Sequence, residues 1–344
     1  FTLMMSMTAD VCDLDELDNG LRREGTFGAI YWWMVKFGMA VAGLLSGLIM
    51  ALTGFAADAA SQAEGVMTGI ARLLRDARID PGAVFRVVHA TTLFTNALIE
   101  RRGAKAGLIT TAGFRDVLEI GRERKYQLYD ITIQKPVPLI PRHLRAEVPE
   151  RMDVSGAVVV PLDEDALVET ARGLIAKGVT SLAIVFLHSY ANPAHELRAI
   201  TVLAKAFPGI ALSASVDVAP EIREYERTST TACNAYIKPL AERYLGRLTE
   251  RLKGAGISAD LLMMLSNGGL TNVTEASRVP VQLLESGPAA GALAAAFLAA
   301  GDGGEHVLAF DMGGTTAKLS VIDHGVPKIT YSCLLYTSPS PRDL

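Results

Sequence analysis

The residues whose chemistry and arrangement most clearly indicate a ligand site lie between two short apolar stretches close to the C-terminal end of the chain. They are Asp311, Gly313, Gly314, Thr315 and Thr316. The two glycines let backbone N–H groups approach an anion closely, and the threonine hydroxyls add further donors. Asp311 has the carboxylate that Mg²⁺ prefers as a ligand, usually through water. We therefore expect a β-hairpin whose turn wraps a phosphate; a tight hairpin without a ligand is the alternative.

A second group lies where a short apolar strand is followed by a helical pattern. It consists of His89, Thr91, Thr92 and Asn96. Helix N-termini attract anions, and ligands of open α/β sheets gather at the carboxyl ends of strands. His89 is a candidate general acid or base because imidazole titrates near neutrality, and the other three are candidate substrate contacts. The alternative is that the threonines only cap the helix and that His89 is a satisfied core residue.

Two further segments combine glycine with small polar residues at the ends of regular elements. The first contains Ser266, Asn267, Gly268 and Gly269 after an apolar run, and the second contains Glu285 and Gly287 before an alanine-rich helix. Both suit a nucleotide that rests against the backbone, so we count all six as candidate cofactor contacts. Close packing of the backbone explains the glycines equally well.

His188 and His195 lie in another strand-to-helix segment. A zinc site needs further ligands, and no third candidate lies nearby in the sequence, so we favour a structural loop with Asn192 as the helix cap. Thr228 or Ser229 is expected to cap the long helix that follows the charged segment 223–227. No serine has the GxSxG surroundings of a hydrolase nucleophile.

The elements that would position these residues alternate between helices and strands. Helices are expected over 64–77, 93–101, 163–177, 193–206, 228–253 and 287–300, and strands over 84–89, 106–111, 181–187 and 261–265. Residues 129–160 read as a largely irregular insertion. The continuous apolar run at 181–187 is typical of a strand covered on both faces. The alternation predicts an α/β fold with a layered, largely parallel sheet.

Composition excludes several classes of protein. The chain has 344 residues, a formal net charge of −4 and 50% hydrophobic residues. The acidic balance gives no general attraction to nucleic acid, and the apolar content excludes a disordered chain. The three cysteines, Cys12, Cys233 and Cys333, are too scattered for a disulfide framework or a zinc site.

The N-terminal segment differs from the rest. No charged residue occurs between Phe37 and Ala57, a run that meets the about 20 helical residues needed to cross a bilayer. Gly43 and Gly47 form a GxxxG pair within it, and basic residues precede it. We expect one transmembrane helix with a cytoplasmic N-terminus and membrane contact through 37–57; a buried helix is the alternative.

From about residue 64 to 329 the chain resembles the hydantoinase A/5-oxoprolinase family, which also includes acetone carboxylase subunits. The segments that carry the resemblance are 89–92, 96–105, 111–122, 186–196, 223–230, 266–269, 285–290 and 311–316. The phosphate hairpin resembles that of the actin and sugar-kinase ATPase fold. The resemblance implies a partial actin/sugar-kinase-like architecture, ATP and Mg as cofactors, a cytoplasmic location for this part and a hydantoinase B-type partner.

The activity implied by the resemblance is hydrolysis of a five-membered cyclic amide, hydantoin or 5-oxoproline. Phosphorylation of the amide oxygen would make the carbonyl a better electrophile for water. Carboxylation is a variation within the family. Members normally begin with their own Asp-x-Gly-Gly-Thr loop, which is absent here, and Lys318 stands where many members have Asp or another polar residue. We therefore expect little or no catalysis from this chain alone.

Residues 12–62 resemble a loop and helix of sodium–sugar symporters of the major facilitator class. Residues 331–344 resemble a translated sequencing adapter and are excluded from the fold analysis. The expected organisation is a symporter-like fragment at 1–60, a hydantoinase/oxoprolinase N-terminal domain at 61–225, the start of an ATPase-like domain at 226–330 and the tail. Alternatives are a membrane-anchored α/β binding module, a symporter-derived fragment without catalysis and a sugar-kinase-like enzyme.

Overall fold

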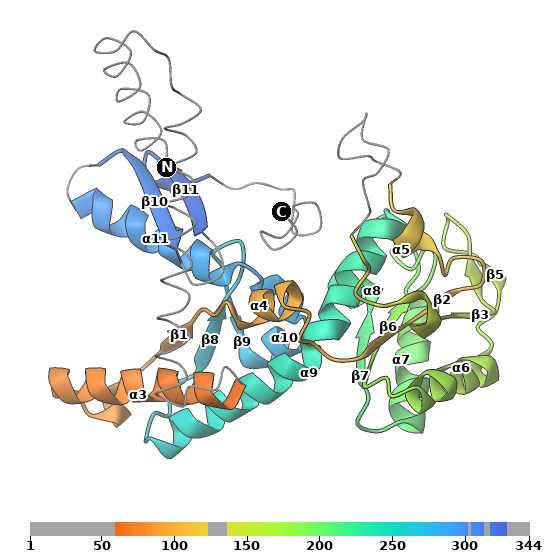
Figure 1. Cartoon of the computed structure of the whole chain (residues 1–344), viewed down its shortest axis with the longest axis horizontal. Coiled ribbons are helices and arrows are strands. Elements are labelled where there is room, and N and C mark those ends of the chain that lie inside the picture. Colours follow the sequence, from red (N-terminus) through yellow and green to blue (C-terminus); the bar gives the residue numbers. More distant parts are fainter. Residues whose placement is uncertain (1–58, 123–135, 302–303, 313–316, 329–344) are drawn as a thin grey trace, which may run out of the picture. The chain divides into compact units, whose positions relative to one another are not determined.

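A computed structural model describes residues 59–122, 136–301, 304–312 and 317–328 (Figure 1). Nearly all of them belong to one compact unit that begins at Gln62. The predicted membrane segment 37–57 and the turn residues 313–316 lie outside the described residues. Among the helices of the described ranges, none combines the length and the apolar character needed to cross a bilayer.

A four-stranded parallel sheet forms the core of one region. Its strands are β2 (Ala106–Thr111), β3 (Arg145–Val148), β6 (Ser181–Val185) and β7 (Ala211–Ala214), in the order β3-β2-β6-β7. Every residue of β2 and β6 is buried, as expected for central strands covered on both faces. Helices α6 (Glu164–Ala176) and α7 (Ala194–Ala206) pack on this sheet and on each other, and α9 (Glu224–Gly254) packs on it as well. The predicted layered α/β arrangement is confirmed.

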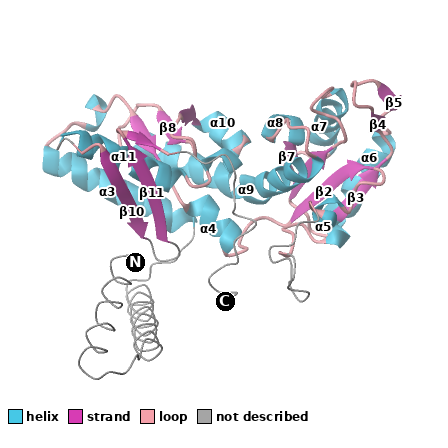
Figure 2. Cartoon of the chain, turned by 90° about the horizontal axis from the view of Figure 1, so that it is seen from above, coloured by secondary structure: helices cyan, strands magenta, loops and turns pink. Residues whose placement is uncertain are grey.

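A mixed sheet and a hairpin carry the candidate site. Strand β1 (Val87–His89) pairs in parallel with β8 (Leu261–Met264), which pairs antiparallel with β9 (Leu270–Asn272). Strands β10 (His306–Met312) and β11 (Ala317–Asp323) form the predicted hairpin (Figure 2). Strand β12 (Val326–Pro327) pairs with β11 and extends it. Helix α11 (Ser286–Gly301) packs against β10 and β11.

The remaining elements are shorter or lie at the edges. They are α3 (Ala59–Ala77), η1 (Pro81–Ala83), α4 (Leu93–Ile99), α5 (Val117–Ile120), η2 (Arg142–Leu144), β4 (Arg151–Met152), β5 (Val158–Val160), α8 (Ser215–Val218), α10 (Val273–Arg278) and η3 (Pro280–Leu283).

The prediction of an irregular segment at 129–160 is wrong for its second half. Residues Arg145–Val148 form the edge strand β3, and β4 and β5 form a small antiparallel ribbon. Residues 145–148 do alternate polar and apolar side chains, but four residues with two charges are too short a pattern to distinguish a strand from a loop, and pairing with β2 makes this segment a strand. Sequence periodicity carries no information about such a partner.

The predicted start of the long helix is also wrong. Helix α9 begins at Glu224, so Thr228 lies inside its first turns rather than at the cap. The Thr228 hydroxyl donates to the backbone oxygen of Glu224 at 2.6 Å, an i−4 bond that is common for threonine within a helix. Asp163 caps α6 and accepts from the Ala166 N–H at 2.9 Å.

The contact of Gly103 with α9 predicts a large effect of one added methyl group. A Cβ at Gly103 would lie 2.1 Å from a ring carbon of the buried Tyr236. Gly103→Ala is expected to lower the free energy of unfolding by about 1–3 kcal/mol through overpacking. The matched control is Gly173→Ala on the exposed face of α6, where no atom lies within 4 Å; it is expected to raise stability by about 0.5–1 kcal/mol. Chemical denaturation of both variants measures the difference, and equal effects would contradict it.

Candidate active site

The loop after β1 and the N-terminus of α11 are held together by direct hydrogen bonds. The buried Ser286 hydroxyl lies 3.4 Å from the Thr91 nitrogen and 3.3 Å from the Thr91 carbonyl oxygen. The Glu285 N–H donates to the Thr95 hydroxyl of α4 at 3.2 Å. Two segments about 190 residues apart in the sequence, both predicted as ligand contacts, therefore meet at one place.

The β10–β11 hairpin is tied to the same place by an ion pair. Lys318 of β11 pairs with the carboxylate of Glu285, and Lys318 is the register partner of Asp311 on β10. Glu285 has φ of +62°, a left-handed conformation that is uncommon for a residue other than glycine and that clusters at functional sites. Asp311 is exposed at the end of its strand, while Gly313, Gly314, Thr315 and Thr316 lie outside the described residues.

His89 lies at the carboxyl end of β1 and contacts the buried Tyr244 of α9. Its Nε2 is 2.8 Å from the Tyr244 hydroxyl. Burial lowers the pKa of His89, so the imidazole is neutral at neutral pH, and burial raises the pKa of the Tyr244 hydroxyl. A neutral imidazole with a tyrosine partner can accept or relay a proton. Sequence reasoning missed Tyr244, which is 155 positions away and sits in no recognisable motif.

The other candidates of this loop have local roles. The Thr91 hydroxyl accepts from the Leu93 N–H at 3.2 Å, but the N-cap position of α4 is Thr92. Thr92 is exposed and makes no side-chain cap, and Asn96 is half-buried within α4. A Cβ at Gly287 would lie 3.1 Å from the Thr92 methyl group, so this glycine permits the close approach of α11.

Residues Ser266–Gly269 form the turn between β8 and β9. The Leu265 N–H donates to the Gly269 oxygen at 2.8 Å, and the Asn267 side chain accepts from the Gly269 N–H at 2.9 Å. Gly268 has φ of +83°, and a Cβ there would lie 3.2 Å from Leu293 of α11. Hairpin geometry and packing against α11 thus account for these glycines, and Ser266 and Asn267 stay exposed beside the helix that begins at Ser286.

Comparison with known proteins gives the family. The hydantoinase/oxoprolinase N-terminal region matches residues 49–207, and the hydantoinase/oxoprolinase family matches residues 227–339. The chain belongs to the hydantoinase/oxoprolinase family over these residues. The MFS/sugar transport protein family matches residues 1–94 and overlaps the first match. Both resemblances expected from the sequence are confirmed.

The relatives of this hydantoinase/oxoprolinase chain are longer proteins. It is 42% identical over 265 residues to an uncharacterized protein of Methanocaldococcus jannaschii, covering 76% of this chain and 39% of the relative. It is 36% identical over 240 residues to the caprolactamase subunit alpha of Pseudomonas jessenii, covering 69% and 34%. The 5-oxoprolinase 1 of Arabidopsis thaliana is 29% identical, with 88% and 25% covered. The chain thus spans well under half of each of these relatives.

Two solved structures share the fold of the hydantoinase/oxoprolinase region. Nucleotide-free acetone carboxylase has a TM-score of 0.69 at 29% identity, over 76% of this chain and 39% of that chain. The ATP-dependent caprolactamase from Pseudomonas jessenii has a TM-score of 0.65 at 34% identity, over 74% and 38%. The mixed α/β fold of the family is therefore present here.

The family segment 186–196 forms a structural loop in the hydantoinase/oxoprolinase chain. The Asn192 side chain accepts from the N–H of Ala194, the first residue of α7, at 3.0 Å, but Pro193 rather than the predicted Asn192 holds the N-cap position. His195 Nδ1 is 2.7 Å from a Glu150 carboxylate oxygen, and His188 Nδ1 is 3.3 Å from the Tyr190 hydroxyl. The two histidines therefore have separate partners.

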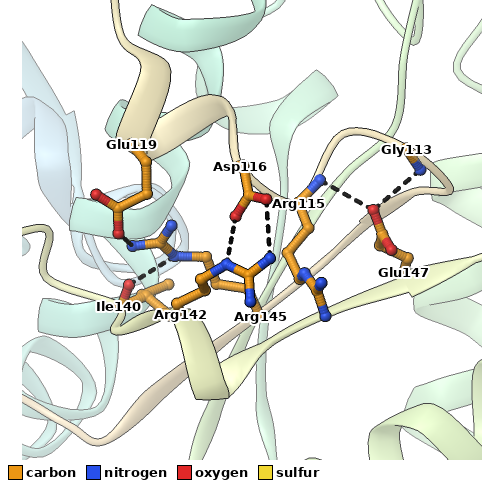
Figure 3. Close-up of polar contacts among 8 residues, drawn as sticks. All are labelled: Gly113, Arg115, Asp116, Glu119, Ile140, Arg142, Arg145 and Glu147. Atoms are coloured by element: carbon orange, nitrogen blue, oxygen red, sulfur yellow. Dashed lines mark hydrogen bonds and ion pairs between the residues drawn. The ribbon is translucent and has the colours of Figure 1, made fainter.

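The family segment 111–122 is held by charged side chains on neighbouring strands and turns (Figure 3). Arg142 binds both carboxylate oxygens of Asp116 at 2.8 and 3.0 Å, and the buried Arg145 binds Glu119 at 3.0 Å. Glu147 of β3 accepts the N–H groups of Gly113 and Arg115. These pairs fix the loop after β2, while the buried Nε of the Arg115 side chain has no hydrogen-bond partner among the described residues.

Proposed function

We propose that the protein to which these residues belong is an ATP-dependent hydrolase that opens a five-membered cyclic amide, hydantoin or 5-oxoproline. The observation that carries the proposal is the convergence of Thr91, Glu285 and Lys318, which brings three predicted ligand segments to one place. The relatives support the reaction class, because they include 5-oxoprolinases and an ATP-dependent caprolactamase. The choice of a five-membered ring rests on the sequence resemblance.

The residues present fit a nucleotide with its metal ion. Asp311 offers an exposed carboxylate for water-mediated Mg²⁺ binding, and Lys318, which pairs with Glu285, is its cross-strand partner in the hairpin. The N-terminus of α11, with the close approach at Gly287, offers free N–H groups. Bound ATP would supply the phosphoryl group that activates the amide oxygen. The hairpin and α11 would then form part of an actin/sugar-kinase-like ATPase domain at 226–330, after an N-terminal domain at 61–225.

His89 is the candidate proton-transfer residue. Its neutral imidazole and the Tyr244 hydroxyl form a pair that can position or move a proton near the loop after β1. Thr92 and Asn96 border this loop and remain the candidate substrate contacts. Several relatives bear subunit names, among them the alpha subunit of caprolactamase and the beta subunit of acetone carboxylase. We infer that a hydantoinase B-type subunit or domain completes the enzyme and that this chain alone has little or no turnover.

The proposal is tested by two measurements on the full chain. Saturation-transfer NMR is expected to show contact with ATP in the presence of Mg²⁺, and Asp311→Ala and Lys318→Ala are expected to reduce the signal. Lys328→Ala, at the far end of the β10–β11–β12 sheet, is the control. Phosphate release that requires 5-oxoproline or hydantoin is expected only with a hydantoinase B-type subunit present. ATP-dependent phosphorylation of a sugar hydroxyl, or no ATP signal, would overturn the proposal.

A second candidate is a membrane-anchored α/β binding module. It is favoured by the uncharged run 37–57 and by the match of residues 1–94 to the MFS/sugar transport protein family. Fractionation separates the two, because a membrane anchor would keep the protein in the membrane pellet after a high-salt wash. A protein that is removed by the wash would contradict this candidate.

A further inference from the structure

Four side chains with metal-binding groups gather at one end of the β10–β11–β12 sheet. Glu305 precedes β10, His306 begins it, Asp323 ends β11 and His324 follows in the turn to β12. The ligand atoms of Glu305, His306 and His324 all lie within 4.8 Å of one another. The site lies at the opposite end of β10 from Asp311, so it is separate from the candidate nucleotide site.

The backbone brings these residues together in a defined way. His306 is the register partner of Asp323, and the backbone N–H of His324 donates to the backbone carbonyl oxygen of Glu305 at 2.6 Å. His324 and Gly325 link paired strands with φ of +50° and +76°, as a two-residue type I′ hairpin turn requires. The left-handed backbone of His324 is uncommon for a residue with a side chain and fixes its imidazole beside that of His306.

One carboxylate orients both imidazoles. Asp323 Oδ1 is 2.8 Å from His306 Nδ1 and 3.0 Å from His324 Nδ1. An ionised carboxylate only accepts hydrogen bonds, so each ring donates its Nδ1–H and keeps its Nε2 lone pair available. Metal-binding histidines are held by carboxylates in the same way. The Nε2 of His324 points to the Glu305 carboxylate, 3.9 Å away.

We propose that Glu305, His306 and His324 bind a zinc-like divalent transition-metal ion, with Asp323 as the residue that positions both histidines. Two imidazoles and a carboxylate suit Zn²⁺, with Zn–N bonds of about 2.0–2.1 Å and water in the open position. Ligand atoms of a tetrahedral zinc site lie about 3.3 Å apart. From the separation of at most 4.8 Å seen here, these exposed side chains need to approach one another by only about 1.5 Å. The side chains of His306 and His324 are 70% and 68% exposed, which leaves access for the ion.

The bound ion would clamp the base of the phosphate hairpin. It would add a side-chain link between the start of β10 and the turn after β11, which the backbone hydrogen bond from the His324 N–H to the Glu305 oxygen already joins. Because binding to the folded state alone stabilises that state, Zn²⁺ is expected to raise the thermal stability of the chain.

The test uses the untagged full chain after treatment with a chelator. Calorimetry with Zn²⁺ is expected to show one equivalent, and Co²⁺ is expected to give the visible absorption of a four-coordinate ion. His306→Ala and His324→Ala are each expected to weaken Zn²⁺ binding at least about tenfold, and Asp323→Asn about tenfold. His143→Ala removes an exposed histidine of η2 and is the matched control, with unchanged binding.

Three outcomes would overturn the proposal. They are no Zn²⁺ equivalent in the wild type, an unchanged equivalent in the His306→Ala/His324→Ala double variant, and a loss of binding in His143→Ala as large as in the cluster variants. Circular dichroism of each variant excludes a folding defect as the cause, and the exposed positions make such a defect small.

Discussion

Phe94→Ala is expected to lower the free energy of unfolding by about 3–5 kcal/mol. Phe94 is completely buried in α4, and its ring meets Tyr244 edge-on, with centroids 6.2 Å apart at 83°. Truncation removes the transfer free energy of the ring and leaves a cavity between α4 and α9 that the surrounding backbone fills only in part. Urea denaturation followed by circular dichroism measures the loss.

The same substitution at an exposed phenylalanine is the control. Phe85 is 88% exposed, so Phe85→Ala is expected to change stability by no more than about 0.5 kcal/mol. A second readout concerns the site, because Tyr244 also holds His89 at 2.8 Å. In Phe94→Ala the NMR resonances of the His89 ring are expected to shift. Equal stability losses in the two variants would show that the packing between α4 and α9 is not as the structure has it.

The helices and the central strands could be predicted because their residues repeat a pattern that needs no distant partner. Asp163 before the apolar stripe of α6 indicates a helix, and the continuous apolar run of β6 indicates a buried strand. Neither signal depends on residues far away in the sequence. The edge strand β3 was missed because its polar–apolar alternation covers only four residues, two of them charged, and its pairing with β2 is not visible in the sequence. The start of α9 was misplaced since Thr228 can cap a helix or bond back within one, and the sequence does not distinguish these two uses.

The candidate site was predictable as a set of segments but not as a set of contacts. The hairpin at Asp311, the loop at Thr91 and the start of α11 each have a local composition that indicates a ligand. The ion pair of Lys318 with Glu285 and the hydrogen bond of His89 with Tyr244 join residues far apart in the chain, so they depend on the fold. The phosphate turn itself, residues 313–316, remains a prediction because it lies outside the described residues.

The second large effect is expected at Glu196, a completely buried carboxylate of α7. It accepts the Phe186 N–H at 2.7 Å, the Ser215 hydroxyl at 2.6 Å and the Val216 N–H at 2.8 Å, and so joins the end of β6 to α8. Glu196→Ala would leave the buried Phe186 N–H and the partly buried Val216 N–H without an acceptor, at a cost of about 1–3 kcal/mol for a buried donor. The variant is expected to be less stable by about 3–5 kcal/mol, including the cavity.

The pH dependence of this loss has a definite sign. Burial raises the pKa of Glu196 above its ordinary value of 4.5, although the three donors oppose the shift, and burial also lowers the pKa of the neighbouring Arg227. The folded state therefore holds the Glu196 proton more tightly than the unfolded state does. The stabilisation from Glu196 is complete below the unfolded value and is lost as pH rises through the folded pKa. The stability difference between wild type and Glu196→Ala is expected to be larger at about pH 5 than at about pH 8.

Glu164→Ala supplies a control of opposite sign. Glu164 is on the surface at the start of α6, and Arg198 binds both of its carboxylate oxygens at 2.8 Å. This hydrogen bonding holds the pKa of Glu164 below its ordinary value, so its stabilisation is present above that value and is lost as pH falls. The difference in the free energy of unfolding between wild type and Glu164→Ala is expected to be small and to shrink toward low pH. If the Glu196→Ala difference instead grew with pH, Glu196 would be an ionised partner of Arg227, because only a lowered folded pKa produces that slope.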